Sequence, residues 1–486
     1  MNILFVYSSD DVQSQTKLLM TQQQMQFGIS YISAFLKKHG HQTELLVLSK
    51  LLDRDKKSKM IDEYIMRFCP GLICFTCVST EYSFIVDVAK YIKRNYRNIY
   101  LLVGGPHVSL NPEKVLFDDF DALCVGEGEN ATLELVLQLE NGCVPRGIAN
   151  LWIQNGLAVE KNSTRPFIQE LEKVPFPDRE MWQKWIKDKA VSFSVLISRG
   201  CPFKCTYCCN HVLGELASGP YVRHRAPANI VGEIREIMNR FPEAEEIYFE
   251  GETITTMGVE RIKELCFKLK ALNKTLSRPL SFGTNVRVIP DYNFKKLFTA
   301  LKESNFRFVN VGLESGSERV RREILGRHYS NRDIINAVAT AREYGLQVAL
   351  FNMIGVPGET MADFKKTVEL NRECSPDWHM TSIFFPYPGT KLFSLCEKQG
   401  LLDKSIDTDL ERRRAICDFS EFKKNKIQKS YTWFDYYVYR GLKPMYKILA
   451  HVLRAKLSSN RYFSYYYRTL MRLSFFEWFK EMAQKY

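Results

Sequence analysis

Short apolar runs alternate with amphipathic helical patterns through residues 1–145, and this alternation constrains the fold more than any other feature. Apolar strands separated by helices predict an α/β domain with a parallel sheet that is covered on both faces. Helices are expected over 28–40 and 81–96, among others. Five strands in this arrangement predict a flavodoxin-like, or Rossmann-like, domain. The predicted strands are 2–7, 43–48, 71–78, 99–105 and 121–126.

The alternation stops over 146–186, which is proline-rich, has no sustained periodicity and is interpreted as a linker. It resumes over 187–410, where six strand-and-helix units predict a partial (β/α)6 barrel with its chemistry at the carboxyl ends of the strands. A helical region is expected over 411–486. The six predicted strands are 192–198, 246–250, 280–285, 306–314, 347–355 and 379–388.

Three loops of the first domain are candidates for ligand binding. Open parallel sheets bind ligands beyond the carboxyl ends of their strands, and the sequence places "STEY", "GGPHVS" and "GEGE" there. Glycine lets a bulky ligand approach the backbone, although a tight turn also needs glycine. The candidate residues are Ser79, Thr80, Glu81, Tyr82, Gly104, Gly105, Gly126 and Glu127.

A second constraint is the segment "RGCPFKCTYCCN", in which Cys201, Cys205 and Cys208 have C-x3-C-x2-C spacing. The cysteines could form a metal site, a redox pair, a disulfide framework or part of a core. The chain opens on a strand-like "MNILFVYSSD" without a leader pattern, and no apolar run has the length of a membrane span. We therefore expect a cytoplasmic protein, where clustered thiols hold metal more often than they form disulfides.

The number of ligands separates zinc from an iron–sulfur cluster. Structural zinc takes four ligands, commonly from two knuckles, and here a second CxxC is missing, so His211 would have to be the fourth ligand. Three thiolates suit a [4Fe–4S] cluster with one iron open to an exogenous ligand. Cys209 is expected to point elsewhere, because adjacent residues do not easily turn toward one ion.

The C-x3-C-x2-C spacing, with the aromatic Tyr207 before the last cysteine, resembles the radical S-adenosylmethionine (SAM) superfamily. The resemblance implies a [4Fe–4S] cluster on the three cysteines, with SAM chelated by the open iron. It also implies that an electron from the cluster cleaves SAM to a 5′-deoxyadenosyl radical.

Segments at later strand ends resemble the same family over 187–410. The resemblance implies that Glu252, in "FEGETITT", accepts hydrogen bonds from the SAM amino group, and that Arg327, in "ILGRHYS", pairs with the carboxylate. Each residue also has a plain structural interpretation, such as a helix-start acid, a turn glycine or a surface charge. Further SAM contacts are implied for Glu314 and Ser315 in "VGLESGSERV" and for Ile354 and Gly355 in "MIGVPGET".

A five-stranded domain before such a core, with "VGGPHVSLNPE" and "VGEGEN", resembles the cobalamin-binding members of this superfamily. The D-x-H-x-x-G motif that supplies a histidine to cobalt in many cobalamin domains is missing, since the first loop reads "YSSDDVQSQTK". The resemblance therefore implies a cobalt without a histidine ligand, approached from below by the loop Thr80-Glu81-Tyr82. We interpret His107 as a turn residue.

The C-terminal region is basic and aromatic. The formal net charge is +13, and residues 401–486 hold eighteen Lys and Arg against nine Asp and Glu. Seventeen aromatic residues fall within 431–486. This region could stack on bases, lie in a membrane interface, cover the barrel and bind substrate, or pack on the core. No barrel of short strands follows the core, so we expect no nucleic-acid partner and leave peripheral membrane contact open.

These patterns lead to a functional prediction. We expect a C-methyltransferase that moves a methyl group from SAM, through methylcobalamin, to an unactivated carbon of a hydrophobic, lipid-like or natural-product substrate. A reductase, flavodoxin or ferredoxin is the expected electron donor. Cyclisation or rearrangement without methyl transfer is one alternative, and a non-catalytic cobalamin sensor or membrane-associated protein is another. Intact Glu252, Glu314 and Arg327 argue against the last.

Overall fold

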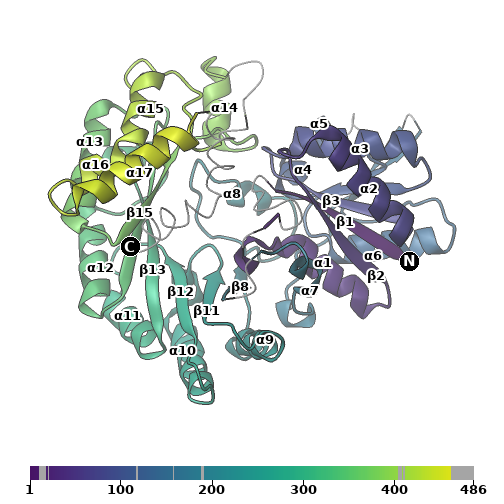
Figure 1. The fold of residues 1–486 in the computed structure, drawn as a ribbon, viewed down its shortest axis with the longest axis horizontal. Helices are drawn as coiled ribbons and strands as arrows, with labels where there is room; N and C mark the ends of the chain where they lie inside the picture. Colours follow the sequence, from purple (N-terminus) through teal and green to yellow (C-terminus); the bar gives the residue numbers. More distant parts are fainter. Residues whose placement is uncertain are drawn as a thin grey trace. The chain divides into compact units, whose positions relative to one another are not determined.

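The computed structural model describes residues 1–9, 18–19, 21–115, 119–156, 158–187, 191–402, 408 and 411–460 of the 486-residue chain. Its contacts divide the chain into two compact units (Figure 1). The first unit comprises 1–202 and 209–244, and the second comprises 203–208 and the described residues from 245 onward. The division crosses the cysteine segment twice. The domain limits expected from the sequence remain a prediction.

The first unit is built on a seven-stranded sheet of order β2-β1-β3-β4-β5-β6-β7. The first five strands are parallel, and this 2-1-3-4-5 order confirms the predicted flavodoxin-like fold. The centre of β1 is almost completely buried, which explains its unbroken apolar sequence. These strands are β1 (Asn2–Ser8), β2 (Gln42–Leu48), β3 (Leu72–Thr76), β4 (Tyr100–Gly104) and β5 (Ala122–Cys124).

Helices cover both faces of this sheet, as expected for a doubly wound fold. Helices α1 and α6 contact each other, and α2 and α3 lie on the opposite face (Figure 1). The bounds are α1 (Phe27–Lys38), α2 (Arg54–Phe68), α3 (Tyr82–Asn95), α4 (Pro106–Leu110), α5 (Pro112–Val115) and α6 (Glu129–Glu140), with η1 (Gln22–Gln24) ahead of α1.

The segment interpreted as a linker is not irregular throughout. Its first part forms β6 (Leu151–Asn155) and β7 (Ala158–Lys161), an antiparallel hairpin that extends the sheet from β5. An Asn-Gly pair between short strands is a hairpin signal, and Gly156 has a φ of +64°. The rest contains η2 (Leu171–Lys173) and α7 (Glu180–Gln183), whose Trp182 is fully buried. This packing makes the segment part of the first unit.

The first unit also contains the strand that precedes the cysteine segment. This is β8 (Ser192–Leu196), the first of the six strands predicted after the linker. It is followed by β9 (Ser198–Arg199), which pairs with β10 (Arg223–His224) in antiparallel fashion. The helices here are α8 (Asn210–Leu213) and α9 (Pro227–Arg240).

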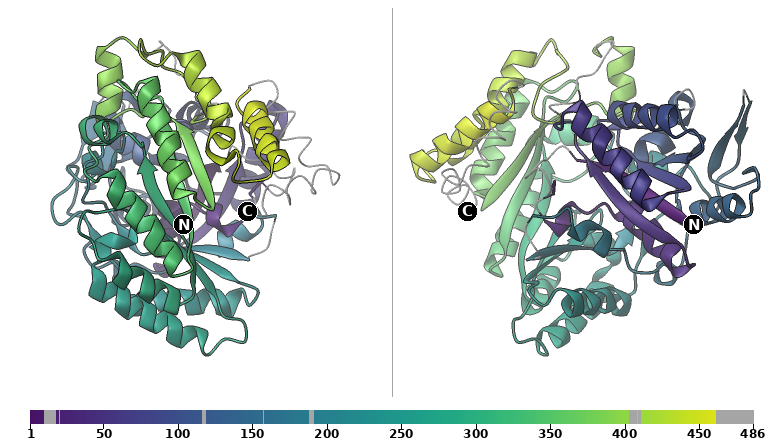
Figure 2. Two further views of the ribbon diagram at one scale, coloured as in Figure 1. Left: turned by 90° about the vertical axis from the view of Figure 1, so that its left-hand side faces the viewer. Right: turned by 45° about the vertical axis from the view of Figure 1, so that its right-hand side comes forward.

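The second unit contains five consecutive parallel strands, in sequence order from β11 to β15. A helix follows each strand, and the long helices lie side by side on one face (Figure 2). This confirms the partial-barrel architecture of parallel strands and helices. The strands are β11 (Glu246–Glu250), β12 (Ser281–Val286), β13 (Phe306–Glu314), β14 (Gln347–Ile354) and β15 (Trp378–Ile383). The helices are α10 (Val259–Asn273), α11 (Phe294–Glu303), α12 (Asn331–Glu343), α13 (Met361–Cys374) and α14 (Lys391–Lys398), with short η3 (Ile254–Met257) and η4 (Val320–Ile324).

The C-terminal region is helical where it is described, as predicted. It comprises α15 (Lys424–Thr432), α16 (Phe434–Tyr439) and α17 (Met445–Ser458). Phe434 is buried and its ring lies 6.1 Å from that of Phe364 on α13, so these helices pack against α13 within the second unit. The aromatic segment 461–486 lies outside the described residues. None of the helices that the structure describes is long and apolar enough to cross a membrane.

Candidate functional site

A cavity of about 310 Å³ lies within the first unit, beside the sheet and among its glycine loops. Its walls come from the carboxyl-terminal halves of β3, β4 and β5, from the start of α1, and from the turn before α6. The start of α1 contributes Gln26 and Tyr31, which the sequence analysis did not select. Four predicted site residues line this cavity: Gly104, Gly105, Gly126 and Glu127.

The glycines of this cavity serve different purposes. Gly105 has a φ of +103°, and a Cβ there would lie 2.7 Å from the carbonyl oxygen of Cys77. Glycine is therefore needed at this position by the fold itself, whether or not a ligand binds. A Cβ on Gly104 would approach Cys124 only at 3.4 Å, an ordinary contact. Gly104 is thus a position of the cavity lining where a small side chain could be added without backbone strain.

Glu127 is held by basic side chains at the edge of this cavity. Its carboxylate accepts hydrogen bonds from Arg199 and Arg223, each at 2.9 Å, and from the backbone N–H of Ile168 at 2.7 Å. Burial would raise the pKa of this carboxyl, but the two arginines hold it below its ordinary value. Arg199 also binds Glu129 and stands two residues before Cys201. The GEGE loop therefore anchors the strand that leads into the cysteine segment.

The loop after β3 is not part of the cavity wall, which is formed by other described residues. Thr80 and Glu81 are both buried. The Glu81 carboxylate accepts a hydrogen bond from Ser8 and pairs with the Lys50 ammonium at 3.3 Å. The same ammonium donates to the Thr80 carbonyl at 2.6 Å. These contacts tie the loop to its own domain, and the proposed approach to cobalt stays a prediction.

The remaining two residues of this loop, Ser79 and Tyr82, contact His107. The Ser79 hydroxyl lies 2.9 Å from Nδ1 of His107, and the Tyr82 ring packs at 4.4 Å from the imidazole. Burial and the charge of Lys114 lower the pKa of His107 to about 4. His107 is thus a neutral, packed residue of the short helix α4, and not a turn residue as the sequence had suggested. That it does not bind cobalt stays a prediction.

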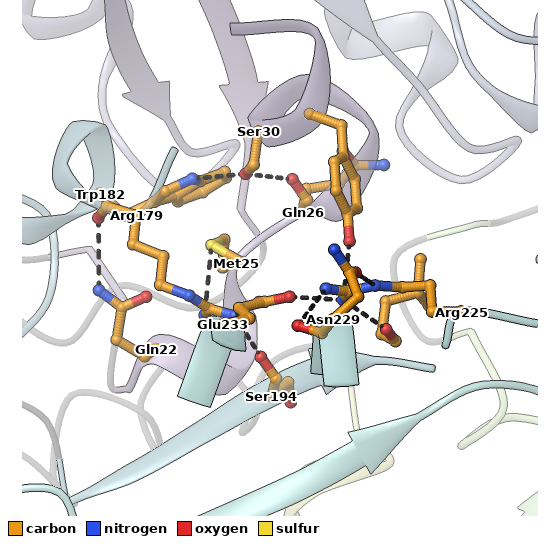
Figure 3. A network of polar contacts seen from close by, with 12 residues as sticks. Gln22, Met25, Gln26, Ser30, Arg179, Trp182, Ser194, Arg225, Asn229 and Glu233 are labelled. Atoms are coloured by element: carbon orange, nitrogen blue, oxygen red, sulfur yellow. Dashed lines mark hydrogen bonds and ion pairs between the residues drawn. The ribbon is translucent and has the colours of Figure 1, made fainter. Parts of the chain in front are cut away.

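A buried ionic network supports the segment that leads into α1 (Figure 3). Glu233 of α9 is 1% exposed and binds two arginines, with distances of 2.5 Å to Arg179 and 2.5 Å to Arg225. Arg179 also donates to the Ser194 carbonyl on β8 at 2.7 Å. One carboxylate thus serves two buried guanidinium groups, and it connects α9 and β8 to the residues around Met25, which Arg179 also contacts.

The cysteines of the segment are not joined in disulfides in the part of the chain that the structure describes. Cys205 is buried, whereas Cys201, Cys208 and Cys209 are partly exposed. Cys205 and Cys208 share a turn in which the Cys208 N–H donates to the Cys205 carbonyl at 3.1 Å. No group of three or more potential ligands is already gathered as a metal site among the described residues. Three thiols within eight residues nonetheless fit a thiolate-ligated cluster by donor chemistry.

An arginine faces the buried thiol from the end of β12. The Arg287 Nη1 atom lies 3.1 Å from the Sγ atom of Cys205, and the guanidinium stacks 3.7 Å from the centre of the Phe203 ring. Arg287 was not among the residues predicted from the sequence. The available signal was its position, two residues after the end of the third predicted strand of the core.

Glu314 and Arg327, which were both predicted at the SAM site, contact each other in the second unit. Arg327 donates to the Glu314 carboxylate at 2.6 Å and to the Tyr207 hydroxyl at 2.7 Å. It also reaches the Gly312 carbonyl at 3.2 Å. Glu314 adopts a φ of +62°, which turns the chain at the end of β13. Burial raises the pKa of Tyr207, so its hydroxyl stays protonated.

The other predicted SAM contacts differ in exposure. Glu252 is exposed in the loop after β11. Ser315 is completely buried and contacts Thr367 of α13, and Ile354 is buried in the core that packs against the C-terminal helices. Ser315 and Ile354 therefore shape the strand ends through packing in this structure.

Gly355 begins a turn that is stabilised by a residue missed from the sequence. The Glu359 carboxylate accepts hydrogen bonds from the backbone N–H groups of Gly355 at 2.5 Å and of Val356 at 3.3 Å. Burial raises the pKa of Glu359 to about 8. Gly355 has a φ of +74°, and a Cβ there would lie 2.8 Å from Ile427 of α15. The sequence signal for Glu359 was its position as the last residue of the "GVPGE" segment.

Two family models match the chain in the order that the sequence suggested. The B12 binding domain matches residues 21–136, and the Radical SAM superfamily matches residues 195–370. The first match covers the domain with the cavity. The second begins just before the cysteine segment and extends into α13.

Curated relatives match most of the chain. An uncharacterized methyltransferase of Pyrococcus horikoshii is 28% identical over 379 residues, covering 77% of this chain and 79% of the relative. The anaerobic magnesium-protoporphyrin IX monomethyl ester cyclase of Rubrivivax gelatinosus is 23% identical over 404 residues, covering 80% of this chain and 68% of the relative.

A solved structure shares the fold. The radical S-adenosylmethionine methyltransferase TsrM from Kitasatospora setae, with cobalamin and a [4Fe–4S] cluster bound, aligns with a TM-score of 0.64 at 17% identity, covering 83% of this chain and 79% of that chain. The chain thus joins a B12 binding domain, matched over residues 21–136, to a radical SAM domain, matched over residues 195–370.

Proposed function

We propose that this enzyme is a cobalamin-dependent radical SAM methyltransferase that modifies an unactivated carbon. The observation that carries the proposal is the combination, in one chain, of a cavity-bearing B12 binding domain and a radical SAM domain with three cysteines and a paired acid and arginine at its strand ends. The Pyrococcus relative, named as a methyltransferase, supports the reaction type. Bound together, the cluster, SAM and cobalamin would supply radical formation and the methyl group.

Within this proposal, the protein residues bind and orient the cofactors. Cys201, Cys205 and Cys208 hold the cluster. We place Glu252 at the SAM amino group, and its side chain is exposed in the loop after β11. The guanidinium of Arg327 already contacts Glu314, Tyr207 and a backbone carbonyl. A direct pair between Arg327 and the SAM carboxylate would therefore require Arg327 to exchange one of these partners.

The cavity of the first unit supports a specific placement for part of cobalamin. Its volume of about 310 Å³ is at the small end of the range for ligand sites, too small for a whole corrinoid. We place the dimethylbenzimidazole tail of cobalamin there, beside the sheet. Aliphatic and aromatic walls such as Phe5, Ile29 and Phe75 suit a flat apolar ring, and Ser109 and Gln26 offer polar contacts.

A cyclisation or rearrangement without methyl transfer is the second candidate function. The relationship to the Rubrivivax cyclase favours it, because that relative matches 80% of this chain. A hydrophobic, lipid-like or natural-product substrate, an electron donor of the flavodoxin, ferredoxin or reductase type, and peripheral membrane contact through the C-terminal region remain proposals.

The experiment that tests the proposal uses the anaerobically reconstituted enzyme with methyl-labelled SAM and extracts or pathway intermediates from its native host. Methyl transfer predicts a labelled product with the label on carbon, together with 5′-deoxyadenosine. Cyclisation predicts an altered but unlabelled product and 5′-deoxyadenosine. A variant with all three cysteines replaced by alanine is the matched control and should give neither. Label in the product of that control would contradict the proposal.

A further inference from the structure

Arg287 stands out among the arginines of the second unit because its guanidinium faces sulfur. Arg327 is paired with Glu314 and Arg319 with Asp363, whereas no carboxylate lies within 4.0 Å of Arg287 among the residues that the structure describes. Its closest polar partner is the Sγ atom of Cys205, at 3.1 Å from Nη1. An arginine usually binds a carboxylate or phosphate when it is partly buried. A guanidinium whose polar partner is a thiol is therefore unusual.

Two contacts fix the position of Arg287. Its backbone N–H donates to the hydroxyl of Thr253 at 2.7 Å, and Thr253 is 2% exposed in the loop after β11. Its guanidinium stacks on the Phe203 ring at 3.7 Å, a cation–π distance. Phe203 and Cys205 belong to the same short segment. The stacking therefore holds the guanidinium next to the thiol, and the hydrogen bond to Thr253 holds the backbone end of Arg287.

We propose that Arg287 is a positioning residue that donates a hydrogen bond to the Cys205 thiolate and thereby raises the reduction potential of the cluster. The inference rests on the proposed function, in which Cys205 is a cluster ligand. Hydrogen bonds to cluster sulfurs and nearby charges are known to set the potentials of iron–sulfur clusters.

The direction of the effect follows from charge. One-electron reduction makes the cluster and its thiolates more negative, and the electron comes from an external donor of the flavodoxin or ferredoxin type. A cationic donor at 3.1 Å stabilises the more negative state more strongly than the oxidised one. Reduction is therefore easier with Arg287 than without it. Cluster reduction precedes SAM cleavage in this chemistry, so the residue acts before the substrate is touched.

The test measures the cluster potential of the reconstituted full-length protein, without SAM, by redox titration followed by electron paramagnetic resonance. Arg287→Gln should lower the reduction equilibrium constant about tenfold, which corresponds to about 59 mV for a one-electron couple. Arg287→Lys keeps the charge but loses the planar stacking, and should show a smaller decrease. Iron content should be unchanged in both variants. Arg307→Gln is the control, because it removes an equal charge from the exposed start of β13 and should leave the potential unchanged.

Several outcomes separate this inference from the alternatives. An unchanged potential in Arg287→Gln with full iron content overturns it. An unchanged potential combined with weaker SAM binding also overturns it, and would assign the guanidinium to the SAM carboxylate. If Arg287→Gln fails to retain iron, Phe203→Leu, which removes only the stacking ring, must still lower the potential. If the unmodified protein binds no cluster at all, the proposed function fails first and independently.

Discussion

The two units use glycine and charge in opposite ways at their strand ends. In the first unit, glycines open a cavity, and one acidic residue of its lining, Glu127, is already neutralised by Arg199 and Arg223. In the second unit, charged side chains gather around a buried thiol, and one of them, Arg287, has no carboxylate partner among the described residues. A large neutral ligand needs space, whereas an electron-accepting cluster needs a tuned electrostatic environment. The difference between the units matches the two kinds of cofactor.

The largest expected effect is the loss of the iron–sulfur cluster from the second unit. Replacing Cys201, Cys205 and Cys208 together by alanine should abolish the binding of about four irons per chain, because three thiolates ligate one [4Fe–4S] cluster. Iron and sulfide analysis after anaerobic reconstitution measures this. Cys209→Ala is the control and should retain the cluster. Full iron retention in the triple variant, or stoichiometric zinc in the native protein, would contradict the assignment.

The second prediction tests whether buried charge in the first unit is structural. Glu233→Gln should lower the free energy of unfolding by about 3–5 kcal/mol, because two buried guanidinium groups lose their shared carboxylate. Urea unfolding of the apo-protein measures the change. Glu236→Gln, on the exposed side of the same helix, is the control and should cost less than about 1 kcal/mol. Equal effects of the two substitutions would show that the network is not important for stability.

The third prediction tests whether Glu252 of the second unit binds SAM. Glu252→Gln should weaken SAM binding roughly ten- to a hundredfold, since a charge-assisted hydrogen bond contributes about 1.5–3 kcal/mol, and should leave the iron content intact. Equilibrium binding to the reconstituted protein provides the measurement. Glu260→Gln, an exposed residue at the start of α10, should bind SAM normally. Unchanged affinity in Glu252→Gln would remove this residue from the site.

The fourth prediction probes the space in the first unit. Gly104→Ala should weaken cobalamin binding by about 1–3 kcal/mol, because the added methyl group enters a wall of the cavity. Gly232→Ala, within helix α9 and outside the cavity lining, is the control. Gly105 is unsuitable for this test, because any side chain there meets the backbone of Cys77. Absorbance measures the cobalamin occupancy of each variant. Equal occupancy in the two variants would show that cobalamin does not bind in this cavity.

The smallest expected effect concerns the neutral histidine of the first unit. Burial lowers the pKa of His107 from 6.5 to about 4, so the unfolded chain takes up this proton at a higher pH than the folded one. The resulting stabilisation is present above pH 6.5 and is lost as the pH falls toward 4. Between pH 6.5 and 5.5 the loss should be about 1 kcal/mol. His107→Gln should remove this part of the pH dependence in urea unfolding, and an unchanged profile would contradict it.

Patterns in consecutive residues were sufficient to predict the architecture of both sheets. The run "FRFVNVGLE" predicted the bounds of β13 without error, and the first five strands are parallel, as predicted. These predictions succeeded because buried parallel strands must be apolar along their whole length, a property written in consecutive residues. The hairpin of β6 and β7 was missed although "QNG" carries its turn signal, because proline residues on both sides suggested an irregular segment.

The sequence by itself determined the cofactor class through a family resemblance, which rests on the cysteine spacing and on short segments at the strand ends. Only the tertiary structure decided which selected residues face a ligand and which face the protein. Glu81 and Ser315 are buried against their own domains, Gly105 is required by a neighbouring backbone, and Arg287 reaches Cys205 from a strand end 82 positions away. The physical reason is that a motif specifies where the backbone turns. The direction and the partner of each side chain depend on elements that are distant in sequence and adjacent only after folding.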